Sequence, residues 1–244
     1  MSGHSHFKSI KHLKAITDAK RSQAFSKLAR EIEVAVKTGG KDPNFNPKLR
    51  LAIEKAKDLR MPTENIERAI KRGTGELTGQ KLEEVIFEAY GPGGVAIIIE
   101  AISDNKNRTL GEIKQILNEN GGKLIGEGAV RWMFEKKGCL VINTENQKTK
   151  FQREELELSI IEAGADDIYW HSDNLINVYT KPNELEKVRK NLEEKGIKIE
   201  SFSLDWVAKE TIEVKEKEKE LCEKLFESLD ENDAVQEIYS NLKA

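Results

Sequence analysis

The order of strand and helix patterns after residue 138 is the feature that most limits the folds open to this 244-residue chain. β-rich runs and helical apolar spacings follow one another there as strand, helix, strand, strand, helix, strand. This βαββαβ order is that of a ferredoxin-like sandwich. The expected elements are a strand at 139–143, a helix at 154–163, strands at 167–171 and 175–180, a helix at 183–195 and a strand at 197–202.

Further strand and helix patterns lie on both sides of this stretch. A strand, a helix and a strand precede residue 136, and the same kinds of element follow residue 204. Neither group completes a sheet by itself, so we predict that they form one together. Residues 138–203 are then inserted in a second ferredoxin-like domain, made of residues 80–136 plus 204–244. Its expected elements are a hairpin of strands at 83–90 and 95–102, a helix with a capping box at Thr109 and Glu112, strands at 129–135 and 206–214, a helix at 216–229 and a strand at 234–240.

Residues 1–75 carry helix signals only. Asp18 caps an apolar stripe with helical spacing, and Pro47 occupies the first turn of a second helix. Pro62 opens a third helix, which Gly73 ends. The predicted fold class is therefore α+β, with an N-terminal three-helix unit followed by two ferredoxin-like α/β sandwiches, one inserted in the other.

Charge is distributed unevenly between this helical unit and the rest of the chain. The formal net charge is −3, but residues 1–75 hold 17 Lys and Arg against 8 Asp and Glu, whereas the remainder holds 23 against 35. A basic head on an acidic body favours a polyanionic partner bound by the head. The alternative is a merely solvated helix face. The residues expected to contact phosphate are Lys8, Lys11, His12, Lys14, Lys20, Arg21, Lys27, Arg30, Arg50, Arg68, Lys71 and Arg72.

Two further groups are candidates for contact with nucleic acid. Asn105, Asn107 and Arg108 precede a predicted helix, whose N-terminus favours an anion. The alternative is that these asparagines only satisfy backbone groups of the turn. Phe7 can stack on an unpaired base if it is exposed, or pack onto the helical unit. The run Gly91–Gly94 joins two strands and lacks the spacing of a phosphate-binding loop, so we interpret it as a tight turn.

No enzymatic or metal chemistry is indicated. The chain contains no G-x-S-x-G, no H-E-x-x-H and no nucleotide-binding fingerprint. His4, His6 and His12 have no Cys or carboxylate nearby to complete a zinc site, so we predict no metal, no cofactor and no catalytic residue. A metal-dependent nuclease built on Asp104 and neighbouring glutamates is the remote alternative.

The cysteines and the apolar runs bear on the compartment. Cys139 and Cys222 lie 83 residues apart and fit no C-x-x-C motif, which indicates reduced thiols. The N-terminus has no apolar stretch of the signal type, and no apolar run approaches the ~20 residues of a membrane span. We therefore expect a cytoplasmic protein without a membrane partner. There is no apolar heptad seam for a coiled-coil dimer, and a monomer is expected.

Eight segments between residues 3 and 138 occur in a recognisable order: GHSHFKSIKH, DAKRSQAFSKLAREI, NPKLRLAI, MPTENIERAIKRG, YGPGGVA, DNKNRT, NGGKL and MFEKKG. Together they resemble the YebC/PmpR family, whose mitochondrial relatives act as translational activators. Phe7 stands where tryptophan is common in the family, and Lys106 where arginine is common, and both keep the chemical type. The resemblance implies three domains, one ferredoxin-like domain being inserted in another. It also implies DNA-binding transcriptional regulation or action as a ribosome-associated translation factor.

The predicted function is non-enzymatic regulation of gene expression by a protein that binds nucleic acid through its basic head. The first version is a DNA-binding transcriptional regulator, which rests on the resemblance. The alternative is a translation factor that binds RNA or the ribosome, which the charge pattern supports equally. DNA, RNA and the ribosome are therefore the partners to consider.

Overall fold

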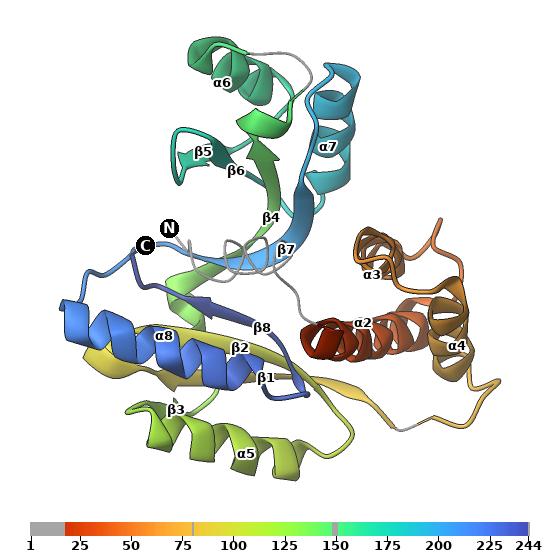
Figure 1. Cartoon of the computed structure of the whole chain (residues 1–244), viewed down its shortest axis with the longest axis vertical. Coiled ribbons are helices and arrows are strands. Elements are labelled where there is room, and N and C mark those ends of the chain that lie inside the picture. The colour runs from red at the N-terminus through yellow and green to blue at the C-terminus, as the bar shows by residue number, and fades with distance from the viewer. Residues whose placement is uncertain (1–17, 80, 148–150, 244) are drawn as a thin grey trace. The chain divides into compact units, whose positions relative to one another are not determined.

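The chain is α+β, as predicted. The structure, a computed structural model, describes residues 18–79, 81–147 and 151–243 (Figure 1). It contains two four-stranded antiparallel sheets and divides into two compact units. The first unit runs to Met133 and resumes at Glu210, and the second unit is Phe134–Lys209.

The N-terminal part of the first unit, which we call the head, contains three helices within residues 18–79. As predicted, Pro47 lies in the first turn of the second helix, and the third begins after Pro62 and ends at Gly73. The cap predicted at Asp18 stays a prediction, because the described residues begin there. Their apolar faces meet in one cluster, in which Ile32, Leu49 and Ala69 are fully buried. Burial of these faces, more than intrinsic helix propensity, stabilises helices of this length. The helices are α2 (Asp18–Gly39), α3 (Pro47–Asp58) and α4 (Thr63–Gly73).

Asn46 joins the end of α2 to the start of α3. Its side-chain oxygen accepts a hydrogen bond from Leu49 N at 3.1 Å and so caps α3. Its Nδ2 donates to the carbonyl oxygens of Ala35 at 2.7 Å and Gly40 at 2.8 Å. Gly39 leaves the space for this side chain, because a Cβ at Gly39 would lie 2.7 Å from Asn46 Cγ. One buried amide therefore fixes the geometry of the α2–α3 loop.

Replacing Asn46 with alanine removes the cap and both amide donors but leaves the apolar cluster intact. We expect Asn46→Ala to lower the free energy of unfolding by about 2–4 kcal/mol, since a cap contributes about 1 kcal/mol and a buried carbonyl without a donor costs about 1–3 kcal/mol. Urea denaturation followed by far-UV circular dichroism measures the loss. Asn44→Ala, at an exposed position of the same loop, is the matched control, and equal losses in the two variants would contradict this role for Asn46.

The sheet of the first unit has the strand order β3-β1-β2-β8, and all neighbouring strands are antiparallel. α5 and α8 cover one face of it. Ile97 and Ile99 of β2 pack there in one cluster with Ile113 of α5 and Leu225 of α8. The elements are β1 (Glu83–Tyr90), β2 (Ala96–Ser103), α5 (Lys106–Glu119), β3 (Lys123–Ile125), α8 (Glu216–Asp230) and β8 (Val235–Ser240).

This sheet has the strand arrangement of a ferredoxin-like sandwich with a changed chain order. β2, α5, β3, α8 and β8 follow one another as usual, but the strand between β2 and β3 is β1, which precedes them all. β1 and β2 are antiparallel neighbours joined by a tight connection, in which Gly93 and Gly94 adopt φ angles of 70° and 78°. The predicted tight turn is present. β1, the strand before this turn, lies between β3 and β2 and completes the four-stranded sheet.

The strands predicted at 129–135 and 206–214 are wrong. Their residues are divided between irregular segments and the ends of two long strands of the second unit, β4 (Phe134–Asn143) and β7 (Ser201–Ala208). β4 and β7 pair with each other from Phe134 opposite Ala208 to Val141 opposite Ser201, so the pairing continues into the residues at the start of β4 and the end of β7. The sequence period of two shows that a run can form a strand but not which sheet it joins.

The capping box predicted at Thr109 and Glu112 is also wrong, because α5 begins earlier. Asn105 is the N-cap, and its Oδ1 accepts a hydrogen bond from Arg108 N at 3.1 Å. Thr109 lies inside the helix, where its buried hydroxyl is 2.7 Å from Ser103 Oγ. Asparagine and threonine are both good caps, and the hydroxyl contact with the end of β2 withdraws the threonine from that role.

The second unit has the predicted βαββαβ order. Its strands are antiparallel and lie in the order β5-β6-β4-β7. Leu140 and Ile142 of β4 pack in one cluster with Ile160 of α6 and Val188 of α7. Its remaining elements are α6 (Arg153–Glu162), β5 (Asp167–Trp170), β6 (Leu175–Thr180) and α7 (Leu185–Glu194).

Glu88 is a buried carboxylate of β1 that holds the turn after β3. It accepts hydrogen bonds from the backbone N–H groups of Gly128 at 2.7 Å, Val130 at 2.8 Å and Arg131 at 3.0 Å. Arg131 Nη2 lies 3.2 Å from the same carboxylate. Burial pushes the pKa of Glu88 upward, but the three N–H donors and the guanidinium outweigh it and hold the pKa below its ordinary value.

Glu88 makes the stability of the fold depend on pH. Because its folded-state pKa is lowered, the carboxylate stabilises the fold above pH 4.5, and this stabilisation is lost as the pH falls through the folded-state pKa. We expect Glu88→Gln to be more destabilising relative to wild type at pH 7 than at pH 3, as measured by urea denaturation. The control is Glu83→Gln, at an exposed position of β1. A Glu88→Gln difference that does not change with pH would show that ionisation of Glu88 is unimportant.

Candidate nucleic-acid interface

The N-terminal arm lies outside the described residues, which begin at Asp18. Several predicted contacts therefore stay predictions, and the interface is described from α2 onward. The candidate contacts in the arm are Lys8, Lys11, His12, Lys14 and Phe7; His4 and His6, which were considered only as zinc ligands, lie outside the described residues as well.

Two predicted phosphate contacts on α2, Lys27 and Arg30, are bound to the turn between α8 and β8 of the same unit. Lys27 Nζ lies 2.6 Å from the carbonyl oxygen of Asp230 and 3.0 Å from its carboxylate Oδ1. Arg30 donates to the carbonyl oxygen of Asp233. The Asp230 carboxylate neutralises the charge of Lys27, and the Lys27 side chain is only 14% exposed. Lys27 is therefore poorly placed to contact a phosphate.

The end of α8 explains this contact. The last carbonyl groups of a helix lack partners and carry the negative end of the helix dipole. α8 has no basic residue in its last turn, and α2 supplies the missing positive charge. Gln23 adds a hydrogen bond to the carbonyl oxygen of Glu231 at 2.8 Å. Lys27 and Arg30 therefore stabilise the first unit, and we leave them out of the contacts proposed for a ligand.

Lys27→Met separates a stabilising role from a ligand-binding role. We expect it to lower the free energy of unfolding by about 1 kcal/mol, because the carbonyl and carboxylate of Asp230 lose a charged donor. A double-mutant cycle with Asp230→Asn, measured by urea denaturation, should show positive coupling between the two side chains. Lys20→Met, on an exposed part of α2, is the control. Unchanged stability with weakened binding of DNA would instead assign Lys27 to phosphate.

Arg50 and Arg72 are also engaged within the head. Arg50 Nη1 donates to the carbonyl oxygen of Pro43 at 2.9 Å. Arg72 Nε lies 3.1 Å from Glu33 Oε2, and the Glu33 side chain is only 8% exposed. Moving Arg72 to a phosphate would leave a buried carboxylate unpaired, which is strongly unfavourable.

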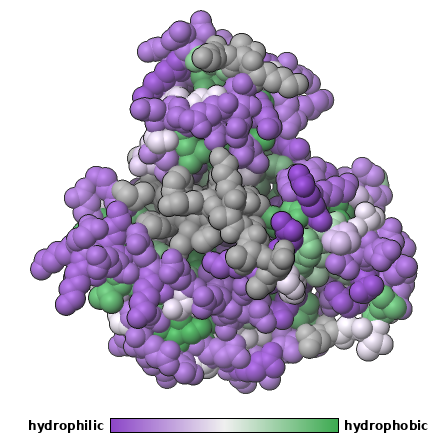
Figure 2. All heavy atoms as spheres, in the orientation of Figure 1, coloured by the Kyte–Doolittle hydropathy of each residue, from purple (hydrophilic) through white to green (hydrophobic). Residues whose placement is uncertain are grey.

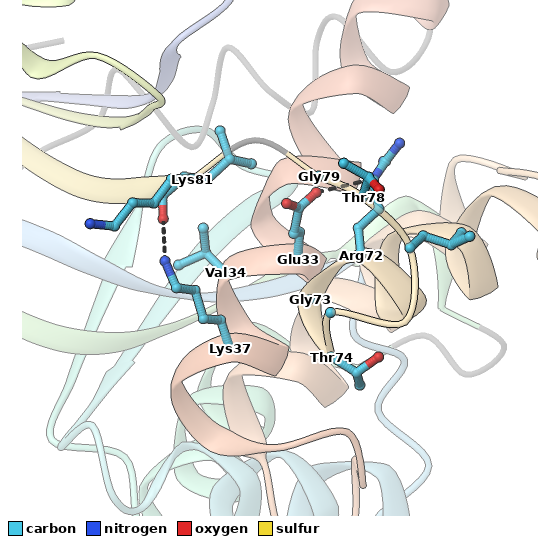
Figure 3. A pocket seen from close by; sticks show the side chains of 12 residues that line it. Glu33, Val34, Lys37, Arg72, Gly73, Thr74, Thr78, Gly79 and Lys81 are labelled. Atoms are coloured by element: carbon cyan, nitrogen blue, oxygen red, sulfur yellow. Dashed lines mark hydrogen bonds and ion pairs between the residues drawn. The ribbon is translucent and has the colours of Figure 1, made fainter.

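A cleft of about 450 Å³ lies between α2, the end of α4 and the linker that follows α4 (Figure 3). Lys37 Nζ donates to the carbonyl oxygen of Leu82 at 3.2 Å, and the Glu33–Arg72 pair forms another wall. At Gly73 a Cβ would lie 2.7 Å from the Glu33 carbonyl oxygen, so the two helices approach closely at this point. Lys37, Glu33 and Arg72 are thus engaged with the chain itself, and we assign the cleft a structural role in bracing the linker.

Three predicted contacts remain exposed and have no side-chain partner among the described residues. They are Lys20 on α2 and Arg68 and Lys71 on α4. Arg68 and Lys71 are three residues apart and therefore lie on one face of α4, away from the buried Ile66 and Ala69. Arg21 on α2 is exposed as well.

Lys57 and Arg60 share this exposure, although neither is among the contacts predicted from the sequence. Lys57 lies at the end of α3, and Arg60 occupies the α3–α4 turn with a φ of 58°. Neither has a side-chain partner within the described part of the chain. The signal was present in the sequence, since both flank the helix stop before Met61-Pro62, where side chains are usually solvated.

The loop before α5 does not present an open anion site. Asn105 uses its side-chain oxygen to cap the helix, which favours the alternative that it satisfies the turn. Arg108 pairs with Asp104, and its Nε lies 3.6 Å from Glu112 Oε1. Asn107 is exposed. The positive charge of this loop is thus offset by neighbouring acids.

Phe45 is an exposed aromatic side chain of the head that the sequence analysis did not consider. It lies between α2 and α3 and is 84% exposed, more than any other large apolar side chain in the described residues. The face of the molecule shown in Figure 2 is mostly hydrophilic, with small separate hydrophobic areas. The surrounding sequence, DPNFNP, consists of turn residues, which was the available signal that this phenylalanine would not enter the core.

Both cysteines are free and buried. Burial, together with Asp205, raises the pKa of Cys139 well above its ordinary value. Burial, with Glu218 and Glu223, raises the pKa of Cys222 to about 11. Both groups are therefore protonated at neutral pH and are poor nucleophiles.

Two kinds of feature are not found in the described residues, 18–79, 81–147 and 151–243. These residues contain no group of three or more His, Cys, Asp and Glu side chains placed to hold a metal ion. None of their helices combines the length and the apolar character that a membrane crossing requires.

Two family descriptions match the chain. Residues 5–76 match the TACO1/YebC protein N-terminal domain, and residues 82–242 match the TACO1/YebC second and third domain. The boundary between the two matches falls in the linker between α4 and β1.

Similar proteins cover nearly the whole chain. A "probable transcriptional regulatory protein" of Halothermothrix orenii is 50% identical over 243 residues, which are 99% of this chain and 94% of that protein. A protein of the same name from Persephonella marina is 48% identical over 244 residues, or 100% of this chain and 96% of that protein. A crystal structure of a conserved hypothetical protein from Aquifex aeolicus has a TM-score of 0.84 and 43% identity, and covers 93% of this chain and 91% of that one.

Proposed function

This chain belongs to the TACO1/YebC family, and we propose from that premise that it regulates gene expression by binding nucleic acid with its basic head. The family is one of regulators, since the relatives from Halothermothrix orenii and Persephonella marina carry the name "probable transcriptional regulatory protein". A regulatory role, not a catalytic one, is therefore proposed, exerted in the cytoplasm.

The observation that carries the proposal is the surplus of solvent-facing positive charge on the head. Acidic side chains or carbonyl groups bind many of the other described head cations, including Lys27, Arg30 and Arg72. A nucleic-acid backbone offers regularly spaced phosphates that complement such charges without sequence information. The cations proposed to contact it are Lys20, Lys57, Arg60, Arg68 and Lys71, with Lys8, Lys11 and Lys14 of the arm.

Duplex DNA is the first ligand to consider, and transcriptional control the first role. The names of the relatives support this version. The proposed contacts are to phosphate, so specificity on duplex DNA would have to come from its shape or from a partner protein.

A translation factor that binds RNA is the second candidate, and the exposure of Phe45 favours it. Proteins that recognise single-stranded regions commonly combine a basic surface with an aromatic side chain on which a base stacks. The bases of a duplex are stacked on one another, so their faces are not available for stacking on such a side chain.

Salt dependence tests the proposed phosphate contacts. If about five of the eight proposed cations, Lys20, Arg68 and Lys71 among them, engage a DNA duplex at one time, the log–log plot of the binding constant against salt concentration should have a slope of about −4 to −5. Lys20/Arg68/Lys71→Ala should make that slope shallower by about 3, because each lost phosphate contact contributes about 0.9. Fluorescence anisotropy with a labelled duplex at several salt concentrations measures both slopes.

The matched control removes three exposed lysines from the second unit, as Lys181/Lys187/Lys198→Ala. It changes the net charge equally and should leave the slope unchanged. A wild-type slope near zero, or equal effects of the two triple variants, would count against binding through the head.

A further inference from the structure

Phe45 combines nearly complete exposure with a braced backbone on a basic domain. We propose that its ring is a stacking platform for an unpaired base, so that the head binds single-stranded nucleotides through the ring in addition to phosphates through its cations. This inference rests on the proposed function, because it names the ligand class of the same head. It replaces no prediction for the arm, where Phe7 was the stacking candidate.

The loop that carries Phe45 is braced from within. The backbone N–H of Phe45 donates to the carbonyl oxygen of Asp42 at 3.2 Å, and the N–H of Asn44 donates to Asp42 Oδ1 at 2.9 Å. On the side toward α3, Arg50 Nη1 donates to the carbonyl oxygen of Pro43 at 2.9 Å. The next residue, Asn46, is buried with three hydrogen bonds of its side chain.

This bracing makes the exposure of Phe45 a property of the fold. Phe45 is not part of the apolar cluster of the head. Phe25 of α2 and Ile53 of α3 pack against that cluster instead. These hydrogen bonds hold the backbone on both sides of Phe45 and so fix where its Cα lies and the direction in which the side chain leaves the loop. A backbone that is already ordered loses little conformational entropy when a ligand covers the side chain, which favours binding.

The charge around the loop suits a phosphate backbone on either side of a stacked base. Residues 41–60 contain six Lys and Arg against three Asp and Glu. Lys41 and Lys48 flank the loop, and their ion pairs with Glu76 at 3.7 Å and Glu84 at 3.1 Å are solvent-exposed. Exposed pairs of this kind contribute little stability, so a phosphate can replace the carboxylate at small cost.

An unpaired base fits this site better than a protein surface does. The core of a protein–protein interface is an apolar patch from which charged residues are depleted. The exposed neighbours of Phe45 are Asn44, Pro47 and Lys48, of which only Pro47 is apolar. A base needs only the face of the ring, because every base has a π-face and stacking tolerates any sequence. The bases of a duplex are covered by their neighbours except at its ends.

The test compares three labelled probes of one sequence: a 12-nucleotide RNA strand, the same DNA strand and a blunt DNA duplex. Full-length wild type, Phe45→Ala, Phe45→Tyr and the control Leu77→Ala are titrated by anisotropy; Leu77 is another exposed apolar residue of the first unit. Phe45→Ala should weaken binding of the single strands by roughly 5- to 150-fold and leave duplex binding unchanged. Phe45→Tyr and Leu77→Ala should bind like wild type.

Stacking also predicts that Phe45→Ala lowers affinity without changing the salt slope, because the ring carries no charge. Its thermal unfolding midpoint should equal that of wild type, since the lost side chain is exposed. A loss on RNA and DNA strands alike identifies the base as the contact, and a loss on one strand type alone names the physiological strand.

Two results would overturn the inference. One is an unchanged affinity of Phe45→Ala for both single strands. The other is an equal loss on duplex and single strands. In either case a shallower slope in Lys20/Arg68/Lys71→Ala would still support the proposed function, whereas salt-independent or undetectable binding of every probe by wild type would remove the proposed function itself.

Discussion

Opposite charges on α2 and at the end of α8 hold the head against the sheet of the first unit, and the proposed interface depends on how that charge is divided. The end of α8 and the turn to β8 present carbonyl groups that have no partner within the helix, and the last turn of α8 has no basic residue. Lys27 and Arg30 supply the positive charge and are neutralised in doing so. Only cations that no internal acid or carbonyl engages keep their full attraction for a polyanion, and in the described head these include Arg68 and Lys71 of α4.

Two buried polar side chains give the first unit its ordered loops. Asn46 closes the α2–α3 loop with three hydrogen bonds, and Glu88 gathers three backbone N–H groups after β3. Each side chain is expensive to bury and is stabilised only when all its bonds are made, so each specifies one loop conformation. The consequence for function is clearest at Asn46, because the loop that it fixes carries the exposed ring of Phe45.

Exposed cations and an exposed ring make different contributions to binding. Contacts to phosphate give affinity that falls with salt and does not depend on sequence. Stacking on Phe45 adds a contribution that is independent of salt and requires an unpaired base. A head that combines both would distinguish structural states of a nucleic acid, paired from unpaired, without reading bases through hydrogen bonds. Such discrimination suits a family whose relatives carry the name "probable transcriptional regulatory protein".

The sequence by itself determined what depends on neighbouring residues. Apolar spacing, with local proline and glycine signals, was sufficient for the head helices, for β1 and β2, and for the βαββαβ order of the second unit. The tertiary structure decided what depends on distant partners: the extension of β4 along β7, the withdrawal of Thr109 from capping, and the engagement of Lys27 with a residue 203 positions away. A period or a cap is encoded within a few residues, whereas the partner of a strand edge or of a charge exists only once the chain has brought separate segments together.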